Sequence, residues 1–146
     1  FMMEKLYLIA RIADTRVALR SRAINSVVTV GSPVHVPAAP PHVAGLFALR
    51  SRVFTLIDPH VVIGLPPTAV APGQRVIVVD VADHGYALLA DAIEDVCFID
   101  APETRVTGRL LPGWARVADA MIEHEGASLL VVDPSHFITL PVARAA

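Results

Sequence analysis

The sequence predicts a mainly β protein built from two copies of one structural unit, arranged as paired small barrels or as a sandwich. Residues 9–28 align with residues 78–97 at an offset of 69 without a gap, and seven of these twenty positions are identical. A second match, at an offset of 75, relates Phe54–Pro59 to Leu129–Pro134, and each segment is an apolar run closed by Asp-Pro. Two matches in the same order indicate a duplicated unit and two lobes around a pseudo-twofold axis. Many short strands with few long helical patterns indicate the β class.

The first unit opens with a predicted hairpin. Side chains alternate over Leu6–Ile12 and again over Val17–Arg20, on either side of a turn at Asp14-Thr15. Ser21 is a candidate cap for a short helix that packs one apolar stripe on the sheet. The residues of that stripe are Ile24, Val27 and Val28.

A second hairpin is predicted in the same unit. Residues 34–41 contain three prolines and should be an extended connection, followed by one helical turn near Pro41–Ala44. Two apolar strands, Leu46–Leu49 and Val53–Ile57, then flank the turn Arg50–Arg52. Both strands are rich in large apolar residues and should be central in their sheet.

The end of the first unit is marked by proline. Asp58-Pro59 should stop the second strand, since proline cannot continue a β ladder. Leu65–Gly73 contains three further prolines and is the best candidate linker between lobes. We therefore expect residues 1–70 to form the first lobe and residues 71–146 the second, and leave open an exchange of strands between them.

The second unit should repeat this plan. Val76–Val81 and Tyr86–Leu89 read as a hairpin around Asp83–Gly85, and Ala92–Cys97 as a helix or a bent strand. Glu103–Gly113 should be an exposed connection. The remaining predicted elements are a hairpin of Val117–Ile122 and Ser128–Val132 through Glu125-Gly126, and a helical turn within Ser135–Leu140.

Composition limits the class of protein. The chain has 146 residues, of which 54% are hydrophobic, so it can bury a full core. Every apolar run ends well short of the about 20 residues that a membrane-spanning helix needs, and we expect a soluble protein. Cys97 is the only cysteine, which excludes a disulfide within the chain. A bacterial-type cytoplasm is therefore the expected location, and Cys97 should be a small core residue.

Charge is distributed unevenly along the chain. Residues 1–60 carry seven basic and three acidic side chains, a net charge of +4, whereas residues 61–146 carry five basic and eleven acidic ones, a net charge of −6. This asymmetry suits partners of opposite sign on two faces, or else a solvated surface. A net charge of −2 with 5% aromatic residues does not favour nucleic-acid binding.

The sequence lacks the usual signatures of an enzyme. It has no nucleophile elbow, no glycine-rich phosphate loop and no Cys/His spacing that could hold zinc, and it predicts neither a metal nor a cofactor. Glu123–Glu125 is the densest polar cluster and should be a hairpin tip rather than a metal site. Asp58 and Asp133 should have structural turn roles rather than act as paired carboxylates. The competing enzyme hypothesis is a small hydrolase that uses His124 or Asp133, and neither has an evident nucleophile beside it.

Features suited to recognition remain. Arg50 and Arg52 lie at the turn between two apolar strands, where their side chains should be available to partners. Around them, the segment 37–58 contains eight residues at a characteristic spacing: Pro37, Pro40, Val43, Gly45, Leu49, Arg50, Ile57 and Asp58. This segment resembles the signature of the CheW-like family, which is P-x-x-P-x-x-V-x-G-x-x-N-L-R-G-x-x-x-P-v-i-D. The members of this family are the coupling proteins of bacterial chemotaxis arrays. The resemblance continues through Leu8–Val28 and Gly126–Val132.

The resemblance implies a fold and a function. The family fold is two five-stranded β-barrels around a shared core, which also accounts for the internal repeat. The implied function is a non-enzymatic adaptor that couples the cytoplasmic tips of chemoreceptors to the regulatory domain of a CheA-type histidine kinase. By the same resemblance, Arg50 and Ile24 would contact the receptor, and Ser26 and Val27 the kinase.

The chain departs from the family pattern at several positions. Ala48 replaces the usual Asn, Ser51 the usual turn Gly and Thr55 the usual Pro, while Pro59-His60 replaces Leu-Arg. Ser51 must adopt a turn that glycine makes more easily, whereas Gly126 keeps the glycine in the second copy. These departures leave an alternative: a divergent CheW-like binding module that serves a different kinase or signalling partner.

Overall fold

A computed structural model describes residues 5–139 of the chain, and these residues confirm the mainly β class. The strands are β1 (Leu6–Ile12), β2 (Thr15–Arg20), β3 (Ser26–Thr29), β4 (Val43–Leu49), β5 (Arg52–Ile57), β6 (Arg75–Val81), β7 (His84–Leu89), β8 (Ala92–Phe98), β9 (Ala118–His124) and β10 (Ala127–Val132). The α-helices are α1 (Pro59–Val62), α2 (Pro112–Val117) and α3 (His136–Thr139), and a 3₁₀ helix spans Ser21–Ala23.

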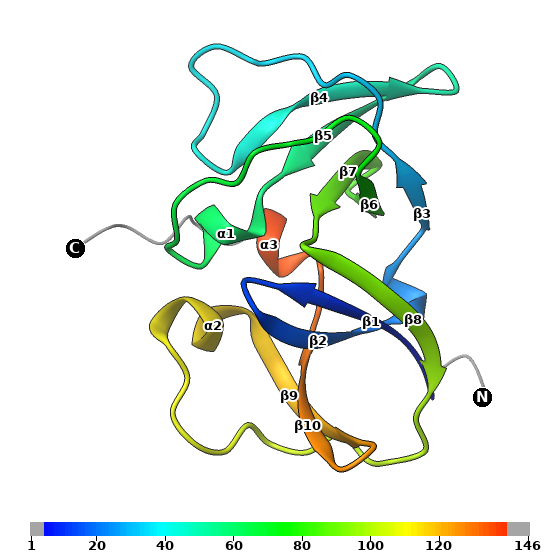
Figure 1. Cartoon of the computed structure of the whole chain (residues 1–146), viewed down its shortest axis with the longest axis vertical. Helices are drawn as coiled ribbons and strands as arrows, with labels where there is room; N and C mark the ends of the chain where they lie inside the picture. The colour runs from blue at the N-terminus through cyan, green and yellow to red at the C-terminus, as the bar shows by residue number, and fades with distance from the viewer. Residues whose placement is uncertain (1–4, 140–146) are drawn as a thin grey trace.

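The strands form two five-stranded sheets (Figure 1). Sheet A has the order β8-β1-β2-β10-β9 and sheet B the order β3-β6-β7-β5-β4. The two orders are the same when strands related by the sequence repeat are matched, so the repeat seen in the sequence is a repeat of structure. The pair β10–β2 is parallel, and so is its counterpart β5–β7.

Each sheet combines strands from both copies of the repeat. Sheet B is built from the continuous stretch β3 to β7, whereas sheet A joins the N-terminal hairpin β1–β2 to the C-terminal strands β8, β9 and β10. The boundary expected between residues 70 and 71 therefore lies between the two copies of the sequence repeat. It does not lie between the two sheets, because each sheet contains strands from both sides of it. The chain passes between the sheets at two places, from β2 to β3 and from β7 to β8.

The expected closure of the sheets into barrels is not found. Within the described residues, β4 and β9 are edge strands of their sheets, and so are β3 and β8. An isolated bridge from Val34 to Leu46 occupies the outer edge of β4, and one from Thr104 to Met121 occupies the outer edge of β9. These bridges come from the segments that follow β3 and β8, the strands at the opposite edges, and each sheet is otherwise open between its two edge strands. Leu46 and Met121 are related by the repeat offset of 75.

Four tight turns close the hairpins. The register leaves two residues in each loop: Ala13-Asp14, Arg50-Ser51, Ala82-Asp83 and Glu125-Gly126. All eight have positive φ, between 50° and 80°. This is the geometry of the type I′ turn, which matches the twist of the flanking strands. The first and third turns lie one position earlier than the sequence indicates, and Ser51 does take the conformation that glycine prefers.

Several predicted elements differ from the structure. The helix expected around Ile24–Val28 is wrong, because only Ser21–Ala23 is helical and the chain then pairs with β6 as β3. The β-branched residues of this segment favour a strand, and their helical spacing is coincidental. Residues 92–97 form a bent strand, with a register shift opposite Ile9 and Ala10. The segment Val43–Leu49 is an edge strand rather than a central one.

Helical structure also departs from the prediction in the connections. No helical turn forms near Pro41–Ala44, where β4 begins directly, whereas the connection 103–113 ends in the unpredicted helix α2. Pro112 begins α2 at a position where its missing N–H costs nothing. The helical turn expected within Ser135–Leu140 is confirmed as α3, and Leu140 lies outside the described residues.

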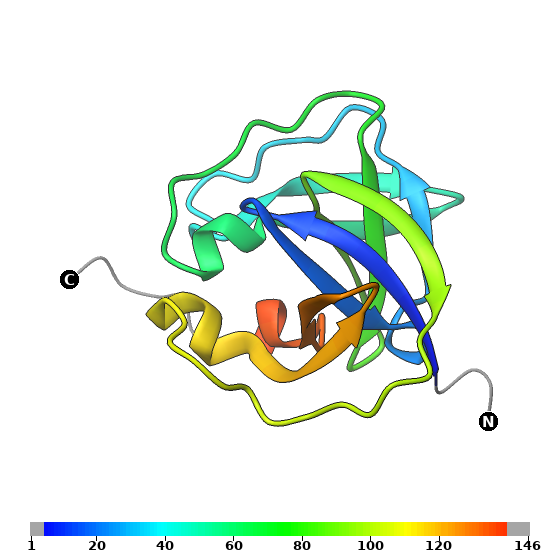
Figure 2. The same cartoon turned by 60° about the horizontal axis from the view of Figure 1, so that its bottom comes forward.

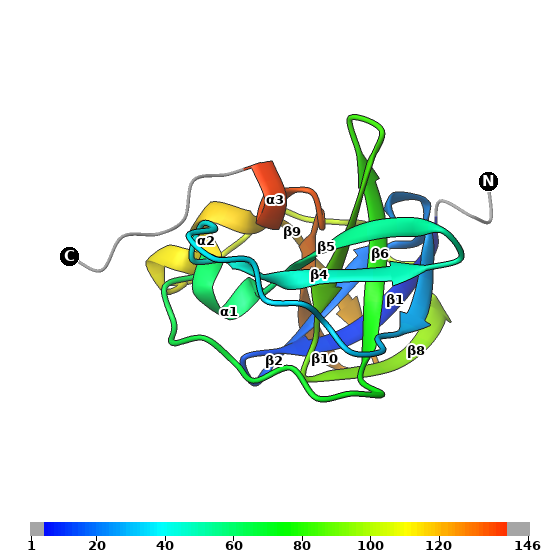
Figure 3. The ribbon, with the colours of Figure 1, turned by 90° about the horizontal axis from the view of Figure 1, so that it is seen from above.

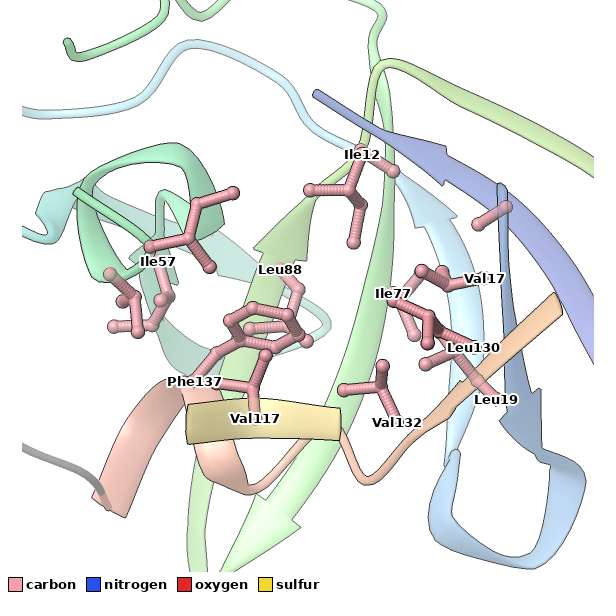
Figure 4. Packing of buried hydrophobic residues seen from close by; sticks show 14 of the residues in the cluster. Ile12, Val17, Leu19, Ile57, Ile77, Leu88, Val117, Leu130, Val132 and Phe137 are labelled. Atoms are coloured by element: carbon pink, nitrogen blue, oxygen red, sulfur yellow. The ribbon is translucent and has the colours of Figure 1, made fainter. Parts of the chain in front are cut away.

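A shared core lies between the two sheets. Ile12, Val17, Leu19 and Leu130 of sheet A meet Ile57, Ile77 and Leu88 of sheet B, and all except Leu130 are at most 1% exposed (Figure 4). Val62, Trp114, Val117 and Phe137 extend this core from the segments of the three helices. The helices gather on one side of the molecule (Figures 2 and 3). Each sheet also covers a smaller cluster on its other face.

The helices approach one another closely at a glycine. A Cβ atom added at Gly113 would lie 2.0 Å from the carbonyl oxygen of Ile63, at the end of α1. Only a residue without a side chain fits there, because the obstructing atom belongs to the backbone. Gly113 therefore sets the distance between α1 and α2.

Candidate functional site

Three of the four residues that the sequence assigns to partner binding lie together. The chain leaves sheet A through the 3₁₀ turn at Ser21–Ala23, and Asn25 N–H donates to the carbonyl of Val78 at 2.8 Å, which starts β3. Ile24, Ser26 and Val27 then line a hollow of about 100 Å³ together with Leu8, Ser21 and Val96. We call this the β3–β8 hollow, because its walls include residues of β3 and of β8, the two strands that begin where the chain has passed from one sheet to the other.

The surroundings of the hollow are apolar and exposed. Val27 is 37% exposed, Val96 56% and Phe98 48%. Val27 and Val96 are equivalent in the repeat, at the offset of 69. Exposed valine and phenylalanine side chains grouped at one place are typical of a surface that a protein partner covers.

The backbone around the hollow also offers free edges. Within the described residues, β3 pairs only with β6, and β8 pairs only with β1. Charged side chains guard the β8 edge: Glu94 contacts Arg11 and Arg16, while Asp95 accepts a hydrogen bond from the N–H of Val96 at 2.8 Å. Such charges disfavour indiscriminate strand pairing along this edge.

Arg50 lies apart from the hollow, at the tip of the β4–β5 hairpin. Its φ is 52°, its side chain is exposed, and no hydrogen bond or ion pair holds it within the described part of the chain. Arg52, which is also exposed, differs in having partners within the chain. Its guanidinium donates to Asp80 at 2.9 Å and lies 4.9 Å from the centre of the Phe54 ring.

Asp80 connects this hairpin to the start of β3. Its carboxylate accepts a hydrogen bond from Arg52 and another, at 2.7 Å, from the side-chain amide of Asn25. The hydrogen bond from Arg52 lowers the pKa of Asp80, so the carboxylate stays ionised. Arg50 and the β3–β8 hollow therefore lie at the same end of sheet B, joined through the chain Arg52–Asp80–Asn25.

The opposite charges of the two sequence halves are brought together in one sheet. The pairs are Lys5–Asp100, Arg11–Glu94, Arg16–Glu94, Arg20–Glu103 and Arg20–Asp119. Every basic residue in this set lies in or beside β1–β2, and every acidic one follows residue 93. Four of the seven basic side chains of the first half are therefore paired with acidic side chains of the second half.

Arg20 is the centre of the strongest of these networks. Its guanidinium donates twice to Glu103, at 2.7 and 3.0 Å, and once to Asp119, at 3.0 Å, while the Tyr7 hydroxyl donates to Glu103 at 2.6 Å. The hydrogen bond from Arg20 lowers the pKa of Glu103. Burial, with the hydrogen bond to Glu103, raises the pKa of Tyr7 to about 12. This network anchors the connection after β8 to the face of sheet A.

The candidate catalytic residues have structural partners. His124 lies at the end of β9 beside Glu125 of the turn, and Glu123 bonds to Ser128 across the hairpin. Asp58 accepts from the N–H of His60 at 3.0 Å, and Asp133 from the N–H of Ser135 at 2.9 Å, so both are turn residues as predicted. Cys97 is half-buried and packs against the smaller cluster of sheet A, so it lies at the margin of the core rather than inside it as predicted.

One group of side chains resembles a ligand set for a metal ion. Oxygen and nitrogen atoms of Asp119, Asp133 and His136 lie within 4.8 Å of one another. Arg20 already binds Asp119, and the Nδ1 of His136 lies 3.1 Å from the carbonyl of Val117. Asp119 and His136 are therefore already engaged by an ion pair and a hydrogen bond with other parts of the chain.

The sequence reasoning missed the contribution of β8 to the site. Val96, Phe98 and Leu8 were not singled out, although the repeat offers a signal: Val96 is the position equivalent to Val27.

No helix among residues 5–139 is long and apolar enough to cross a bilayer.

Comparison with known proteins agrees with this architecture. The model of the CheW-like domain family matches residues 6–142. Among solved structures, the chain is similar to the scaffolding protein TtCheW from Thermoanaerobacter tengcongensis, with a TM-score of 0.72 and 17% sequence identity over 88% of each chain. At this identity the similarity shows the fold. No curated protein matches the sequence.

Proposed function

The chain belongs to the CheW-like family, and from that premise we propose that it is a non-enzymatic scaffold of chemotaxis signalling. In this role it couples the cytoplasmic tips of chemoreceptors, the methyl-accepting chemotaxis proteins, to the regulatory domain of a CheA-type histidine kinase. It acts in the cytoplasm, beside the membrane that holds the receptors, and uses neither a cofactor nor a metal.

The observation that carries the proposal is the β3–β8 hollow. Ile24, Ser26 and Val27 line it, and the family resemblance assigns these same positions to partner contacts. We assign Ser26 and Val27 to the kinase, because an apolar side chain of a partner domain can fill the hollow and cover Val96. Burial of such exposed apolar surface supplies affinity.

Arg50 is assigned to the receptor, and so by the resemblance is Ile24, which packs against the shared core just before β3. An exposed arginine without a partner among residues 5–139 keeps its donors for a carboxylate or a backbone carbonyl on another protein. The rigid type I′ turn holds its backbone, so little order is lost when it binds.

A divergent partner remains the alternative, and specific contacts favour it. Thr55, at the position of the usual Pro, bonds through its hydroxyl to the ring of His84 at 2.9 Å. His60, at the position of the usual Arg, lies 2.9 Å from Asp91. These side chains change the surface beside the hairpin, so the same scaffold could serve a different kinase or signalling protein.

The test is capture of partners by the purified protein. Kinases and chemoreceptors encoded in the same genome are expected to bind it; Arg50→Glu should abolish receptor capture, and Val27→Asp should abolish kinase capture. Arg109→Glu and Val34→Asp are matched controls, since they place the same substitutions at exposed positions elsewhere. Both site variants should unfold at nearly the same temperature as the wild type.

The outcomes separate the two candidates. Capture of neither a receptor nor a CheA-type kinase would refute the coupling role, and capture of a different kinase would favour the alternative. Normal capture by Arg50→Glu and Val27→Asp would show that the assigned residues are wrong even if the function is right. A large loss of folding in Arg50→Glu would show that Arg50 is structural.

A further inference from the structure

A larger hollow lies in sheet B, at the end opposite Arg50. Its volume is about 370 Å³, and it opens between the proline-rich connection before β4 and the segment that follows α1. The lining residues are Pro33, His35, Pro41, Val43, Ala44, Asp58, Pro67, Thr68 and Val70. This volume is at the small end of the range for sites that bind small molecules. Three prolines, two valines and an alanine make most of its wall apolar.

Asp58 is the unusual member of this wall. It is 2% exposed and is the only charged residue of the described chain that is buried. Its carboxylate accepts hydrogen bonds from the N–H of His60 at 3.0 Å, and from the N–H and hydroxyl of Thr68 at 2.8 and 3.0 Å. Oδ1 therefore accepts one donor and Oδ2 two, whereas each carboxylate oxygen can accept about two, so Oδ1 keeps an acceptor position.

No cation within the described chain balances this carboxylate. No lysine, arginine or histidine among these residues forms an ion pair with Asp58. His42, whose carbonyl accepts the N–H of Asp58, stays neutral because burial lowers its pKa, and its Nδ1 is buried without a partner. A buried negative charge is costly unless it is paired, and the wall of an open hollow is where a pairing group could come from outside.

The repeat shows that a turn alone does not require this arrangement. Asp133, the equivalent of Asp58, also accepts an N–H two residues later, from Ser135. It is only half-buried. The corresponding hollow of sheet A, about 250 Å³, is lined by Val106, Gly108, Leu110, Ala115 and Ala118, without any charged residue. The buried carboxylate is thus specific to the first copy.

We propose that the hollow around Asp58 binds a small organic cation, an ammonium group carried on a compact apolar body. The ammonium ion pairs with Asp58 and donates to its free acceptor position, while the prolines and valines cover the apolar part. Such a ligand bridges the connection before β4 and the segment after α1. It would give the scaffold a small-molecule input that is separate from its protein contacts, and the proposal does not rest on the partners proposed above.

The test uses cyclohexylammonium as the probe and cyclohexanol, of the same ring and without charge, as its control. Titration of the ¹⁵N-labelled full chain is followed by the amide shifts of Ala44, Thr68 and Val70. We expect saturable shifts with the amine and about tenfold weaker binding of the alcohol, the difference that a hydrogen bond to a charged group supplies. Equal binding of both probes, or no saturable shift, would overturn the proposal.

Variants distinguish this hollow from general surface binding. Asp58→Asn removes the charge, but it also replaces one of the two acceptor oxygens of the turn with an NH2 group. Ala44→Leu therefore serves as a second variant, which fills the hollow and keeps the carboxylate. Ala44→Leu should abolish the shifts, whereas Ala115→Leu, the matched change in the hollow of sheet A, should leave them intact. Unchanged binding by Ala44→Leu, shown to be folded by its amide spectrum, would refute the site.

Discussion

Ser51 offers a test of how much strain the hairpin that presents Arg50 contains. Its φ is 67°, in the left-handed region, and its repeat equivalent Gly126 has φ of 80°. A non-glycine residue in this region costs about 1–2 kcal/mol. Replacement by glycine removes this strain, but about 0.5–1 kcal/mol of the gain in stability is lost because glycine has more freedom in the unfolded chain. Ser51→Gly should therefore stabilise the protein by about 1 kcal/mol.

The second copy supplies the reverse experiment. A Cβ atom added at Gly126 would meet no heavy atom within 4 Å, so Gly126→Ser adds backbone strain without a steric clash. It should destabilise the protein by a similar amount, about 1 kcal/mol. The double variant should return to nearly wild-type stability, because the two turns belong to different sheets and share no partner.

Urea unfolding provides the measurement. Trp114 is the only tryptophan and is 6% exposed in the shared core, so its fluorescence reports loss of that core. With a slope of about 2 kcal/mol per molar urea, each variant should shift the midpoint by about 0.5 M, in opposite directions. A midpoint lowered in Ser51→Gly, or unchanged in Gly126→Ser, would refute the account of these turns as strained by their backbone conformation.

Three further changes test other parts of the structure. Gly113→Ala must separate α1 from α2 and should cost about 3 kcal/mol in urea unfolding, whereas Gly31→Ala, where an added Cβ meets nothing within 4 Å, should cost little; equal costs would contradict the close approach at Ile63. Because the hydrogen bond from Arg20 lowers the pKa of Glu103 below its usual 4.5, Glu103 stabilises the fold above that pH, and the contribution is lost as the pH falls through the lowered value. Glu103→Gln should thus reduce the difference in unfolding free energy between pH values near 7 and near 3, and an unchanged difference would argue against this network. Val96→Asp, at a position 56% exposed, should weaken kinase capture as Val27→Asp does and leave the unfolding temperature nearly unchanged; normal capture would exclude β8 from the interface.

Local patterns in the sequence were sufficient for the hairpins. Leu6–Ile12 and Val76–Val81 are short apolar runs buried on both faces of their sheets, and the partner strand follows after two residues, so nothing distant is needed. The short helix expected at Ile24–Val28 failed because valine fits both helical spacing and a strand edge, and pairing with β6, about 50 residues away, decides between them. Helix α2 was missed because Pro112-Gly113 reads as a turn, while the requirement for glycine comes from α1.

The candidate site could be predicted only in part, for a similar reason. Resemblance pointed to Ile24, Ser26, Val27 and Arg50, and the first three do line one hollow. The contribution of Val96 depends on the two crossings that bring β3 and β8 together. A repeat shows that two segments are alike, but it does not show which copy each segment pairs with. The engagement of Arg52 by Asp80 likewise depends on the register between β5, β7 and β6.

The order of strands has a consequence for how the protein is made on the ribosome. Sheet B is encoded by one continuous stretch and can be completed as soon as β7 has emerged. The hairpin β1–β2 is made first, yet its neighbours β8 and β10 come last; Val17 pairs with Leu130, more than a hundred residues later. Until β8 and β10 have been made, sheet B is the only sheet against which the apolar faces of this hairpin can pack. The earliest strands of the chain are thus the last to enter a complete sheet, and a ribosome that stops between β7 and β8 leaves one whole sheet carrying an unmatched hairpin.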